Sequence, residues 1–249
     1  MDKDYAVKYY NEEEENWWFV SRRNTILKLL AGENRAAKIL DIGCGGGSLL
    51  VQLKKAGFAN LYGVDISTDA IEKCKERGLD NVFVMDGHNP KFETATFDII
   101  IASDSLEHLE NDKEALHNWN TILQAGGQLI IFVPAFMFLW SEHDVVNHHY
   151  RRYTSGLLKA KVNTAGFSVT RSGYWNFFMF FPTALYRVSQ KILNRINKKK
   201  KEPKDQLKRL NPFVNKMLIQ LLSFENLFFR SVGLITGVSV FVQAKKSNQ

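Results

Sequence analysis

The sequence predicts an α/β fold in which a doubly wound, mostly parallel β-sheet is covered by helices on both faces. From Ala37 onward, short apolar runs alternate with amphipathic stretches, which is typical of successive β-α-β units. A glycine-rich turn follows the first apolar run directly, as it does where such units bind ligands. A chain of 249 residues fits one domain of this kind with additions, so we expect a single domain over residues 1–249.

The expected strands are apolar runs bounded by residues that end extended structure. The first run stops at the glycine turn, and Pro134 closes the fifth because proline cannot continue a central strand. Gly126 and Gly127 turn the chain into that fifth strand. In chain order the predicted strands are Lys38–Ile42, Leu61–Val64, Asn81–Met85, Phe97–Ala102, Gln128–Val133, Phe167–Gly173 and Val238–Ala244.

The helices expected between these strands carry end signals. Gly57 and Gly166 are placed to end two of them, and Ser67 or Thr68 is placed to cap a third. The predicted helices are Ser48–Lys55, Asp69–Arg77, Lys113–Leu123 and Thr154–Ala165.

Two segments lie outside this alternation. Residues 1–35 are expected to form an N-terminal cap with a helix over Trp17–Leu30. About 65 residues separate the last two strands, far more than the usual connection, so residues 175–236 are predicted to be a helical insertion or lid. Its candidate helices are Phe177–Ile196 and Pro212–Val232, joined by a basic loop at Lys198–Asp205.

The composition limits the classes of protein. Cys44 and Cys74 stand apart from any zinc-binding spacing, so neither a disulfide framework nor a structural metal is expected. The segment Met1–Asn16 is acidic and lacks the features of a signal peptide, and no apolar run is long enough to span a bilayer. We therefore expect a cytoplasmic protein, with peripheral membrane contact as an option.

The charge is concentrated at one end. From Arg187 onward there are 14 Lys or Arg and 3 Asp or Glu, so this part carries +11, whereas the rest carries −4. Such a basic end is compatible with an anionic membrane, with nucleic acid, or with a solvated loop.

The segment after the first strand predicts a ligand site. Asp41 ends the strand, and Gly43, Gly45 and Gly47 allow the backbone to turn sharply and approach a ligand. A carboxylate two residues before the first glycine disfavours a pyrophosphate and tolerates a cationic ligand. The alternative is a simple turn with no ligand.

Two further carboxylates follow neighbouring strands. Asp65 closes the second strand, where a carboxylate can accept hydrogen bonds from ribose hydroxyls, and Asp86 follows the third, within reach of an adenine amino group. A helix cap and a turn are the alternatives for these two residues. Since the carboxyl ends of adjacent parallel strands meet at one edge, we favour a shared site.

Several segments resemble the class I (Rossmann-like) S-adenosylmethionine-dependent methyltransferases, in particular small-molecule and lipid-type enzymes similar to the quinone-biosynthesis methyltransferases. They are Leu40–Gly47, Gly63–Ser67, Met85–Gly87, Phe97–Ile100, Leu106–Leu109 and Leu123–Gly127. The resemblance covers about Trp17 to Gly173 and the last strand. It implies a seven-stranded sheet with the last strand antiparallel, S-adenosyl-L-methionine as cofactor and S-adenosyl-L-homocysteine as product.

The resemblance also implies residue roles. The methionine portion would lie beside Gly43 and Gly45 and face Ser103 or Asp104. Asp65 would bind the ribose, Ile66 would pack against the adenine, and Asp86 with Gly87 would lie at the adenine edge. Arg22 would bind the methionine carboxylate, because its helix is placed like the helix that closes over the cofactor in related enzymes.

Histidines are the candidate bases for removing a proton from the acceptor. We name His108, His143 and His148, which follow the fourth and fifth strands and are expected to overhang the cofactor. The alternative is a structural role in the loops. Arg151 and Arg152 are candidates for an acceptor phosphate or carboxylate, or for surface salt bridges.

A metal site is a further option that we do not predict. Quinone-biosynthesis O-methyltransferases similar in this region carry a Glu-x-x-Glu-His pattern. This chain has Asp104 at the first position, followed by Glu107 and His108, and the change at that position is the reason for predicting no metal.

The insertion suggests the acceptor. In Phe177–Ile196, Arg187, Lys191 and Arg195 recur every fourth residue beside an apolar stripe, which is the pattern of an interfacial helix. The two helices either pack on each other as a lid or form a greasy channel that touches the membrane. We predict methyl transfer to a small-molecule or lipid-like acceptor, with oxygen as the expected acceptor atom.

Two other functions remain open. One is an RNA or protein methyltransferase that uses the basic C-terminal region, although the segment Ser103–Leu106 differs from the Asn/Asp-Pro-Pro-Tyr/Phe run of amino-group-methylating nucleic-acid enzymes, which disfavours nucleic acid. The other is a non-catalytic scaffold that binds the cofactor.

Overall fold

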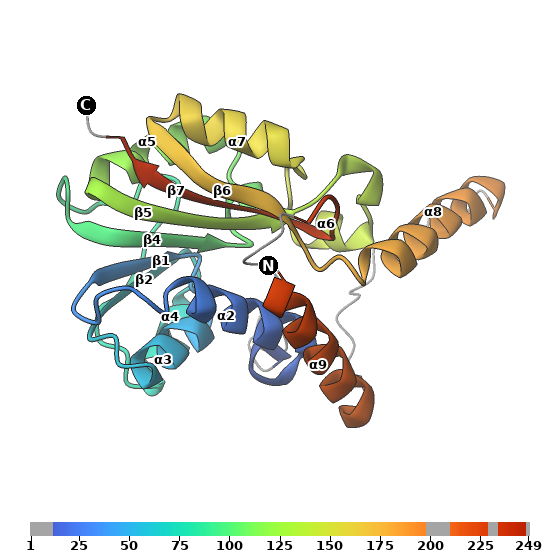
Figure 1. The fold of residues 1–249 in the computed structure, drawn as a ribbon, viewed down its shortest axis with the longest axis horizontal. Coiled ribbons are helices and arrows are strands. Elements are labelled where there is room, and N and C mark those ends of the chain that lie inside the picture. Colours follow the sequence, from blue (N-terminus) through green and yellow to red (C-terminus); the bar gives the residue numbers. More distant parts are fainter. Residues whose placement is uncertain (1–11, 198–209, 229–233, 248–249) are drawn as a thin grey trace.

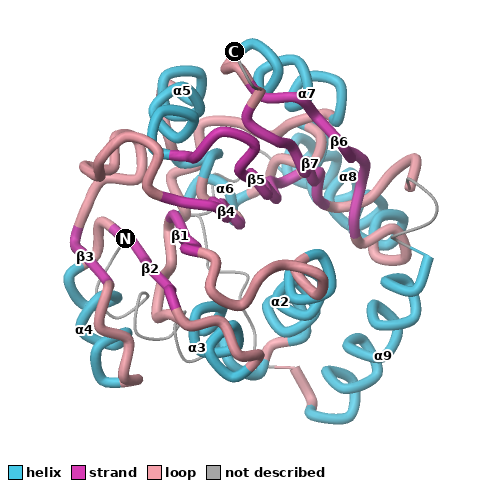
Figure 2. Tube along the Cα trace, turned by 60° about the vertical axis from the view of Figure 1, so that its left-hand side comes forward, coloured by secondary structure: helices cyan, strands magenta, loops and turns pink. Residues whose placement is uncertain are grey.

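The computed structural model describes residues 12–197, 210–228 and 234–247, and its centre is one seven-stranded sheet. The strand order is β3-β2-β1-β4-β5-β7-β6, which Figure 2 shows across the molecule. All pairings from β3 to β5 are parallel, and β7 runs antiparallel to both β5 and β6. The strands are β1 Lys38–Ile42, β2 Asn60–Asp65, β3 Val82–Val84, β4 Phe97–Ser103, β5 Leu123–Pro134, β6 Phe167–Trp175 and β7 Ser239–Lys246.

Helices cover both faces of the sheet, as the alternating pattern predicts (Figure 1). One face packs against α5 and α7, and the other against α2, α3 and α4. The helices are α2 Trp17–Leu29, α3 Ser48–Lys55, α4 Thr68–Glu76, α5 Asp112–Ile122, α6 Glu142–Val146, α7 Ser155–Thr164, α8 Phe180–Asn197 and α9 Pro212–Phe228, with 3-10 turns η1 Leu106–His108 and η2 Met137–Leu139.

The end signals act largely as expected. Ser67 caps α4 by accepting from the backbone N–H of Ala70, and Gly166 follows α7 with a φ of +87°. The bounds of most strands move by one or two residues from their predictions, and one moves further: β5 begins at Leu123 instead of Gln128. Its pairing with β4 shifts register between Phe97 and Ile99, so the residues around Gly126 form an irregular extension of the strand.

The insertion before β7 holds two long helices that pack on different partners. Glu225 of α9 accepts from the backbone N–H groups of Asn176 at 2.6 Å and Phe178 at 3.2 Å, and α9 lies against α2. Helix α8 contacts η2 and extends away from the sheet (Figure 1). The arrangement therefore differs from a pair of helices packed on each other.

Some expectations fall outside the described residues. They are the first eleven residues of the N-terminal cap, the basic loop Lys198–Asp205 and the end of the second insertion helix beyond Phe228. Among the helices that are described, none combines the length and apolar character needed to cross a membrane.

Candidate functional site

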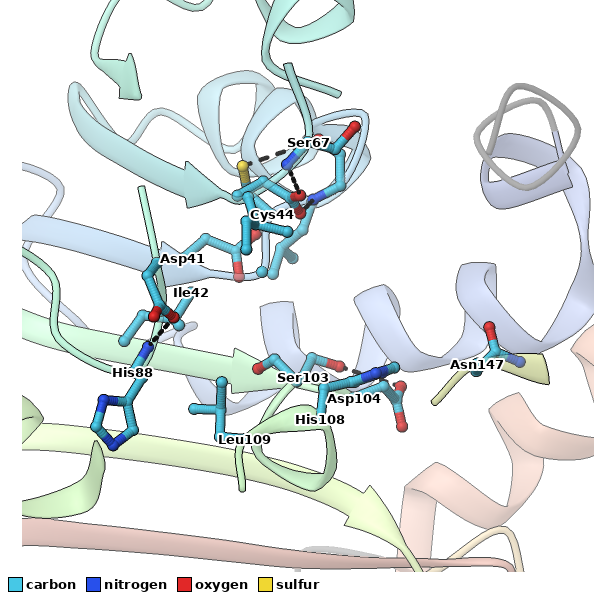
Figure 3. A pocket seen from close by; sticks show the side chains of 18 of the residues that line it. Asp41, Ile42, Cys44, Ser67, His88, Ser103, Asp104, His108, Leu109 and Asn147 are labelled. Atoms are coloured by element: carbon cyan, nitrogen blue, oxygen red, sulfur yellow. Dashed lines mark hydrogen bonds between the residues drawn. The ribbon is translucent and has the colours of Figure 1, made fainter. Parts of the chain in front are cut away.

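A cavity of about 1010 Å³ opens at the carboxyl ends of the parallel strands. Its walls come from the segments that follow β1, β2, β3 and β4, from α2 and from the loop after α6. Figure 3 shows Asp41, Cys44 and Ser67 on one side of it and Ser103, Asp104 and His108 on another. Open α/β sheets bind ligands at this edge, so the cavity is the candidate site.

The turn after β1 leaves little room for side chains. Gly43 and Gly45 have φ values of +74° and +53°, a region that favours glycine. A Cβ atom at Gly43 would lie 2.8 Å from Cβ of Ser105, and one at Gly45 would lie 2.8 Å from Oε1 of Glu13. The backbone can therefore approach a ligand here without interference from its own side chains.

Three carboxylates gather around this turn. Asp41 is 3% exposed, and burial together with the carboxylates of Glu13 and Asp65 raises its pKa to about 8. Burial also raises the pKa of Glu13 to about 7, against the lowering effect of Arg23. The pKa of Asp65 is raised as well, mainly by burial. A group of desolvated carboxylates that repel one another favours a cationic ligand.

Asp65 has the orientation of a hydrogen-bond acceptor at the turn. Its Oδ2 accepts from the backbone N–H of Gly45 at 3.0 Å, and its Oδ1 accepts from that of Ser67 at 2.9 Å. The next side chain, Ile66, is 77% exposed and lines the cavity. The sequence predicted both residues for the ligand, and the structure brings them to its wall.

Asp86 and Gly87 line the same cavity from the segment after β3. Oδ1 of Asp86 accepts from the backbone N–H of His88 at 2.8 Å. A Cβ at Gly87 would lie 2.8 Å from Cγ2 of Ile42, so a larger residue would push against the strand that carries Asp41.

Arg22 reaches the site from α2, but its partner is a protein carboxylate. Nη1 lies 3.1 Å from Oδ2 of Asp104, and Nη2 donates to Oγ of Ser239 at 2.7 Å. Ser103, beside Asp104, also lines the cavity. The predicted contact of Arg22 with a ligand carboxylate would require it to share or leave these partners.

The three candidate histidines are placed differently. His108 and His148 line the cavity, whereas His143 is not among the lining residues and contacts Asn147, whose Nδ2 lies 3.2 Å from its Nδ1. Burial and the neighbouring His149 lower the pKa of His108 to about 4. Burial lowers that of His143 to about 4 as well. His108 is therefore neutral at pH 7, the form that can accept a proton.

A buried ion network fixes the loop that carries these histidines. Asp144 accepts from Nε of Arg152 at 2.7 Å and from its Nη2 at 3.0 Å, and it also contacts Nδ1 of His149 at 3.0 Å. Arg151 lies 3.1 Å from Asp112. Both arginines proposed for an acceptor anion thus have carboxylate partners in the protein.

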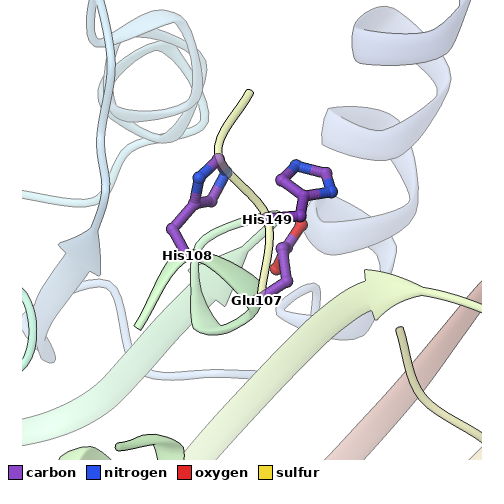
Figure 4. A group of neighbouring side chains, drawn as sticks. All are labelled: Glu107, His108 and His149. Carbon is purple, nitrogen blue, oxygen red and sulfur yellow. The ribbon is translucent and has the colours of Figure 1, made fainter. Parts of the chain in front are cut away.

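A second cluster joins the loops after β4 and β5 (Figure 4). Among the described residues, Glu107, His108 and His149 place their ligand atoms within 4.8 Å of one another. Glu107 is fully buried, no described donor reaches either carboxylate oxygen, and burial with the Asp104 carboxylate raises its pKa well above the usual range. One carboxylate and two imidazoles form a donor set that suits a divalent transition metal.

Two residues of the site were missed in the sequence. Glu13 belongs to an acidic run, which usually indicates a solvated surface, and no spacing distinguishes it from its neighbours. His149 directly follows the candidate His148 in the sequence. The turn after α6 brings the His149 ring to within 4.5 Å of the His108 ring, measured between centroids, and the sequence alone does not predict the path of this turn.

Part of the chain matches a family of known proteins. Residues 40–131 match the family model described as "Methyltransferase domain". This range contains the glycine turn, Asp65, Asp86 and His108.

Curated relatives match over part of their length. Over 107 residues the chain is 36% identical to "Aklanonic acid methyltransferase DauC" of Streptomyces sp. (strain C5), covering 40% of this chain and 49% of the relative. It is 32% identical to "EEF1A lysine methyltransferase 2" of Danio rerio, over 45% and 53%. It is 26% identical to a "Ubiquinone biosynthesis O-methyltransferase" of Hydrogenovibrio crunogenus, over 49% and 48%. The chain thus spans about half the length of these relatives.

Solved structures share the fold. A phosphoethanolamine N-methyltransferase 2 of Haemonchus contortus, solved with S-adenosyl-L-methionine, superposes with a TM-score of 0.59 at 18% identity, over 91% of this chain and 52% of that one. The [4+2]-cyclase SpnF superposes with a TM-score of 0.60 at 16% identity, over 92% and 81%. Because a protein named as a cyclase shares it, the fold does not define the reaction.

Proposed function

We propose that this chain, which carries a methyltransferase domain of the class I family, binds S-adenosyl-L-methionine and methylates a small-molecule or lipid-like acceptor. Oxygen is the expected acceptor atom, and S-adenosyl-L-homocysteine is the product. When bound, the cofactor supplies an electrophilic methyl group on a sulfonium.

The observation that carries the proposal is the group of three carboxylates around the glycine turn. Asp41, Glu13 and Asp65 are desolvated, and all have raised pKa values. A nicotinamide dinucleotide would bring a pyrophosphate, with two negative charges, to this turn. The ammonium and sulfonium of S-adenosylmethionine would instead favour the ionised carboxylates.

The remaining groups fit the rest of that ligand. Asp65 already accepts two N–H bonds in the cavity and would accept from the ribose hydroxyls. The exposed Ile66 offers an apolar surface to the adenine, and Asp86 would accept from its amino group. Ser103 or Asp104 would face the methionine portion.

The histidines supply the proton acceptor. For a hydroxyl acceptor, an imidazole at the cavity would take the proton as the oxygen bonds to the methyl carbon. His108 suits this role because it lines the cavity and its lowered pKa keeps it neutral. His148 is the second candidate. His143 would act through the loop, because it is not among the lining residues.

The names of two similar proteins support a small-molecule acceptor. An O-methyltransferase of ubiquinone biosynthesis and an aklanonic acid methyltransferase are among the similar proteins, and both act on small molecules by their names. The relative named as a lysine methyltransferase supports a protein acceptor as the second candidate function. To distinguish a small-molecule acceptor from a protein acceptor, the purified protein is given labelled cofactor together with either a library of phenolic compounds or a protein extract, and the labelled product is identified.

Calorimetry tests the cofactor directly. The purified chain is titrated with S-adenosylmethionine and, in parallel, with NAD. Micromolar binding of the first alone is expected. Binding of NAD instead, or of neither, would refute the cofactor assignment. Cofactor binding without methyl transfer to any extract fraction would favour the non-catalytic scaffold.

A further inference from the structure

The cluster of Glu107, His108 and His149 joins two segments whose backbones are hydrogen-bonded to each other (Figure 4). Glu107 and His108 belong to η1, after β4, and His149 follows α6. The backbone N–H of Tyr150 donates to the carbonyl oxygen of Glu107 at 2.9 Å, so the residue next to His149 is fixed to η1. The backbone therefore holds the three side chains together before any ligand binds.

The carboxylate of Glu107 lacks the partners that a buried charge needs. Its side chain is fully buried, and no described residue donates a hydrogen bond to either of its oxygens. The buried guanidinium groups nearby are paired with other carboxylates: Arg152 lies 2.7 Å from Asp144, and Arg22 lies 3.1 Å from Asp104. A buried carboxylate without donors is destabilising, and a cation bound beside it would compensate its charge.

Both imidazoles have one ring nitrogen oriented by a partner outside the cluster. Nδ1 of His149 lies 3.0 Å from Oδ1 of Asp144, so this carboxylate accepts the Nδ1–H and Nε2 keeps the lone pair. One ring nitrogen of His108 is hydrogen-bonded to the backbone of Asn147, which leaves the other nitrogen for a ligand. Histidines that bind metals are oriented by a carboxylate or a backbone carbonyl in this way.

The donor set indicates the class of ion. Two imidazole nitrogens and one carboxylate oxygen suit divalent first-row transition metals such as Zn²⁺, whereas Mg²⁺ and Ca²⁺ prefer oxygen ligands. This set differs from the Glu-x-x-Glu-His pattern, because its third ligand is His149, after α6, and not the residue at position 104. Asp104 at the first position of that pattern is therefore no obstacle to a metal here.

We propose that Glu107, His108 and His149 bind a divalent first-row transition metal ion, with Asp144 orienting His149. The binding goes beyond the proposed function, because it requires neither S-adenosylmethionine nor an acceptor. It also limits that function, since His108 lines the cavity and a ring nitrogen that is bound to a metal cannot accept a proton. The role of His108 as proton acceptor thus belongs to the metal-free protein, and a bound metal withdraws His108 from proton transfer.

Calorimetry of the full chain without S-adenosylmethionine tests the binding. The protein is first treated with a chelator, and Zn²⁺ and Mg²⁺ are then the separate probes. We expect one equivalent of Zn²⁺ to bind, and an equal concentration of Mg²⁺ should not displace it. Glu107→Gln, which keeps the shape of the buried side chain, and His149→Ala should each weaken Zn²⁺ binding at least about tenfold.

The matched control is His117→Ala. His117 is exposed on α5 and lies outside the cluster, so this variant should bind Zn²⁺ like the unmodified protein. Thermal melts show whether each variant is folded. In addition, Zn²⁺ should raise the melting temperature of the unmodified protein and of His117→Ala, and should raise that of Glu107→Gln much less, because a ligand stabilises only the protein that binds it.

Three results would overturn the proposal. The first is no Zn²⁺ binding by the unmodified protein, and the second is equal Zn²⁺ affinity in the Glu107, His149 and His117 variants, which would place the ion elsewhere. The third is loss of binding in Asp104→Asn but not in His149→Ala, since the metal would then use position 104. None of these measurements involves S-adenosylmethionine, so the metal site and the proposed function can fail separately.

Discussion

Nη1 of Arg22, on α2, lies 3.1 Å from Oδ2 of Asp104, directly after β4. Arg22 is 2% exposed, and its guanidinium carbon lies 4.4 Å from the ring centroid of Trp175 and 4.5 Å from that of Phe132. This ion pair connects α2 to Asp104, a residue that lines the candidate site. It also places a cation against one of the two residues, Ser103 or Asp104, that the sequence offers for the methionine portion.

Replacing Arg22 by Met should lower the free energy of unfolding by about 2–4 kcal/mol, because Asp104 loses its cation and the rings lose their guanidinium. Urea denaturation measures the change. Arg35→Met is the control: its guanidinium is exposed over the ring of Phe58, at 4.3 Å, so a loss below about 1 kcal/mol is expected. Equal losses in the two variants would contradict a structural role for the contact.

Asp65→Ala should weaken the binding of S-adenosylmethionine by roughly 1.5–3 kcal/mol, which is about 10- to 150-fold in dissociation constant, because charge-assisted hydrogen bonds are lost. Calorimetry at pH 7.5 provides the measurement. Asp80→Ala, at an exposed position outside the cavity lining, should bind like the unmodified protein. Unchanged affinity in the Asp65 variant would refute the proposed ribose position.

The carboxylates predict a pH dependence with a definite sign. In the folded protein the pKa of Glu13 is about 7 and that of Asp41 about 8, both above their usual values near 4. A raised carboxyl pKa stabilises the fold at low pH, and this contribution is lost as the pH rises through the folded pKa. Without ligand, the melting temperature should therefore fall between pH 5 and about pH 8.

A cationic ligand should reverse that trend. Ionised carboxylates bind it better, so affinity for S-adenosylmethionine should rise over the same interval, with protons released on binding below pH 7. Glu13→Gln should flatten both profiles, and Glu72→Gln, on the exposed side of α4, should leave them unchanged. A ligand affinity that is independent of pH in the unmodified protein would rule out a direct role for this carboxylate group.

The sequence predicted the sheet well because its signals are local. β1 and α3 have the predicted bounds, since an apolar run, a glycine turn and a capping glycine fall at their ends. The five-residue helix α6 was missed because it is shorter than two turns and has no measurable periodicity. Periodicity correctly indicated an amphipathic α8, but periodicity alone does not say which side packs on the body. In the structure the cationic side does, through Arg187 and Lys191.

The candidate site likewise contains residues that the sequence pattern predicts and residues that it does not. Asp41, Asp65 and Asp86 follow strands, and the strand pattern is sufficient to bring them to one edge. Glu13 and His149 enter through loop and cap geometry, which depends on tertiary contacts such as the hydrogen bonds of Arg23 to the backbone of Glu13 and Glu14. No spacing in the sequence encodes such contacts.

The histidines can be separated by kinetics. His108→Ala should leave cofactor affinity nearly unchanged and slow methyl transfer about 10²- to 10⁴-fold, because the neutral imidazole at the cavity is removed. In the unmodified protein, the acidic limb of the rate profile should fall near pH 4 instead of pH 6.5, given the lowered pKa of His108. His143→Ala should slow transfer less, since His143 is not among the lining residues. A larger effect at His143 than at His108 would contradict this assignment.

Asp144→Asn tests whether the buried ion network holds both the histidine loop and α8. Burial opposes ionisation of Asp144, but hydrogen bonds from His149 and Arg152 keep its pKa below the usual range. The amide would leave Arg152, which is 5% exposed, without its anion, so the free energy of unfolding should fall by about 3–5 kcal/mol. Arg187 would also lose its carboxylate, so proteolysis near α8 should become faster before global unfolding. The control is Glu142→Gln, at the start of α6 and outside the ion network, which should change neither the free energy of unfolding nor the rate of proteolysis. If this variant shows the same losses, they reflect damage to α6 and not the loss of the ion network.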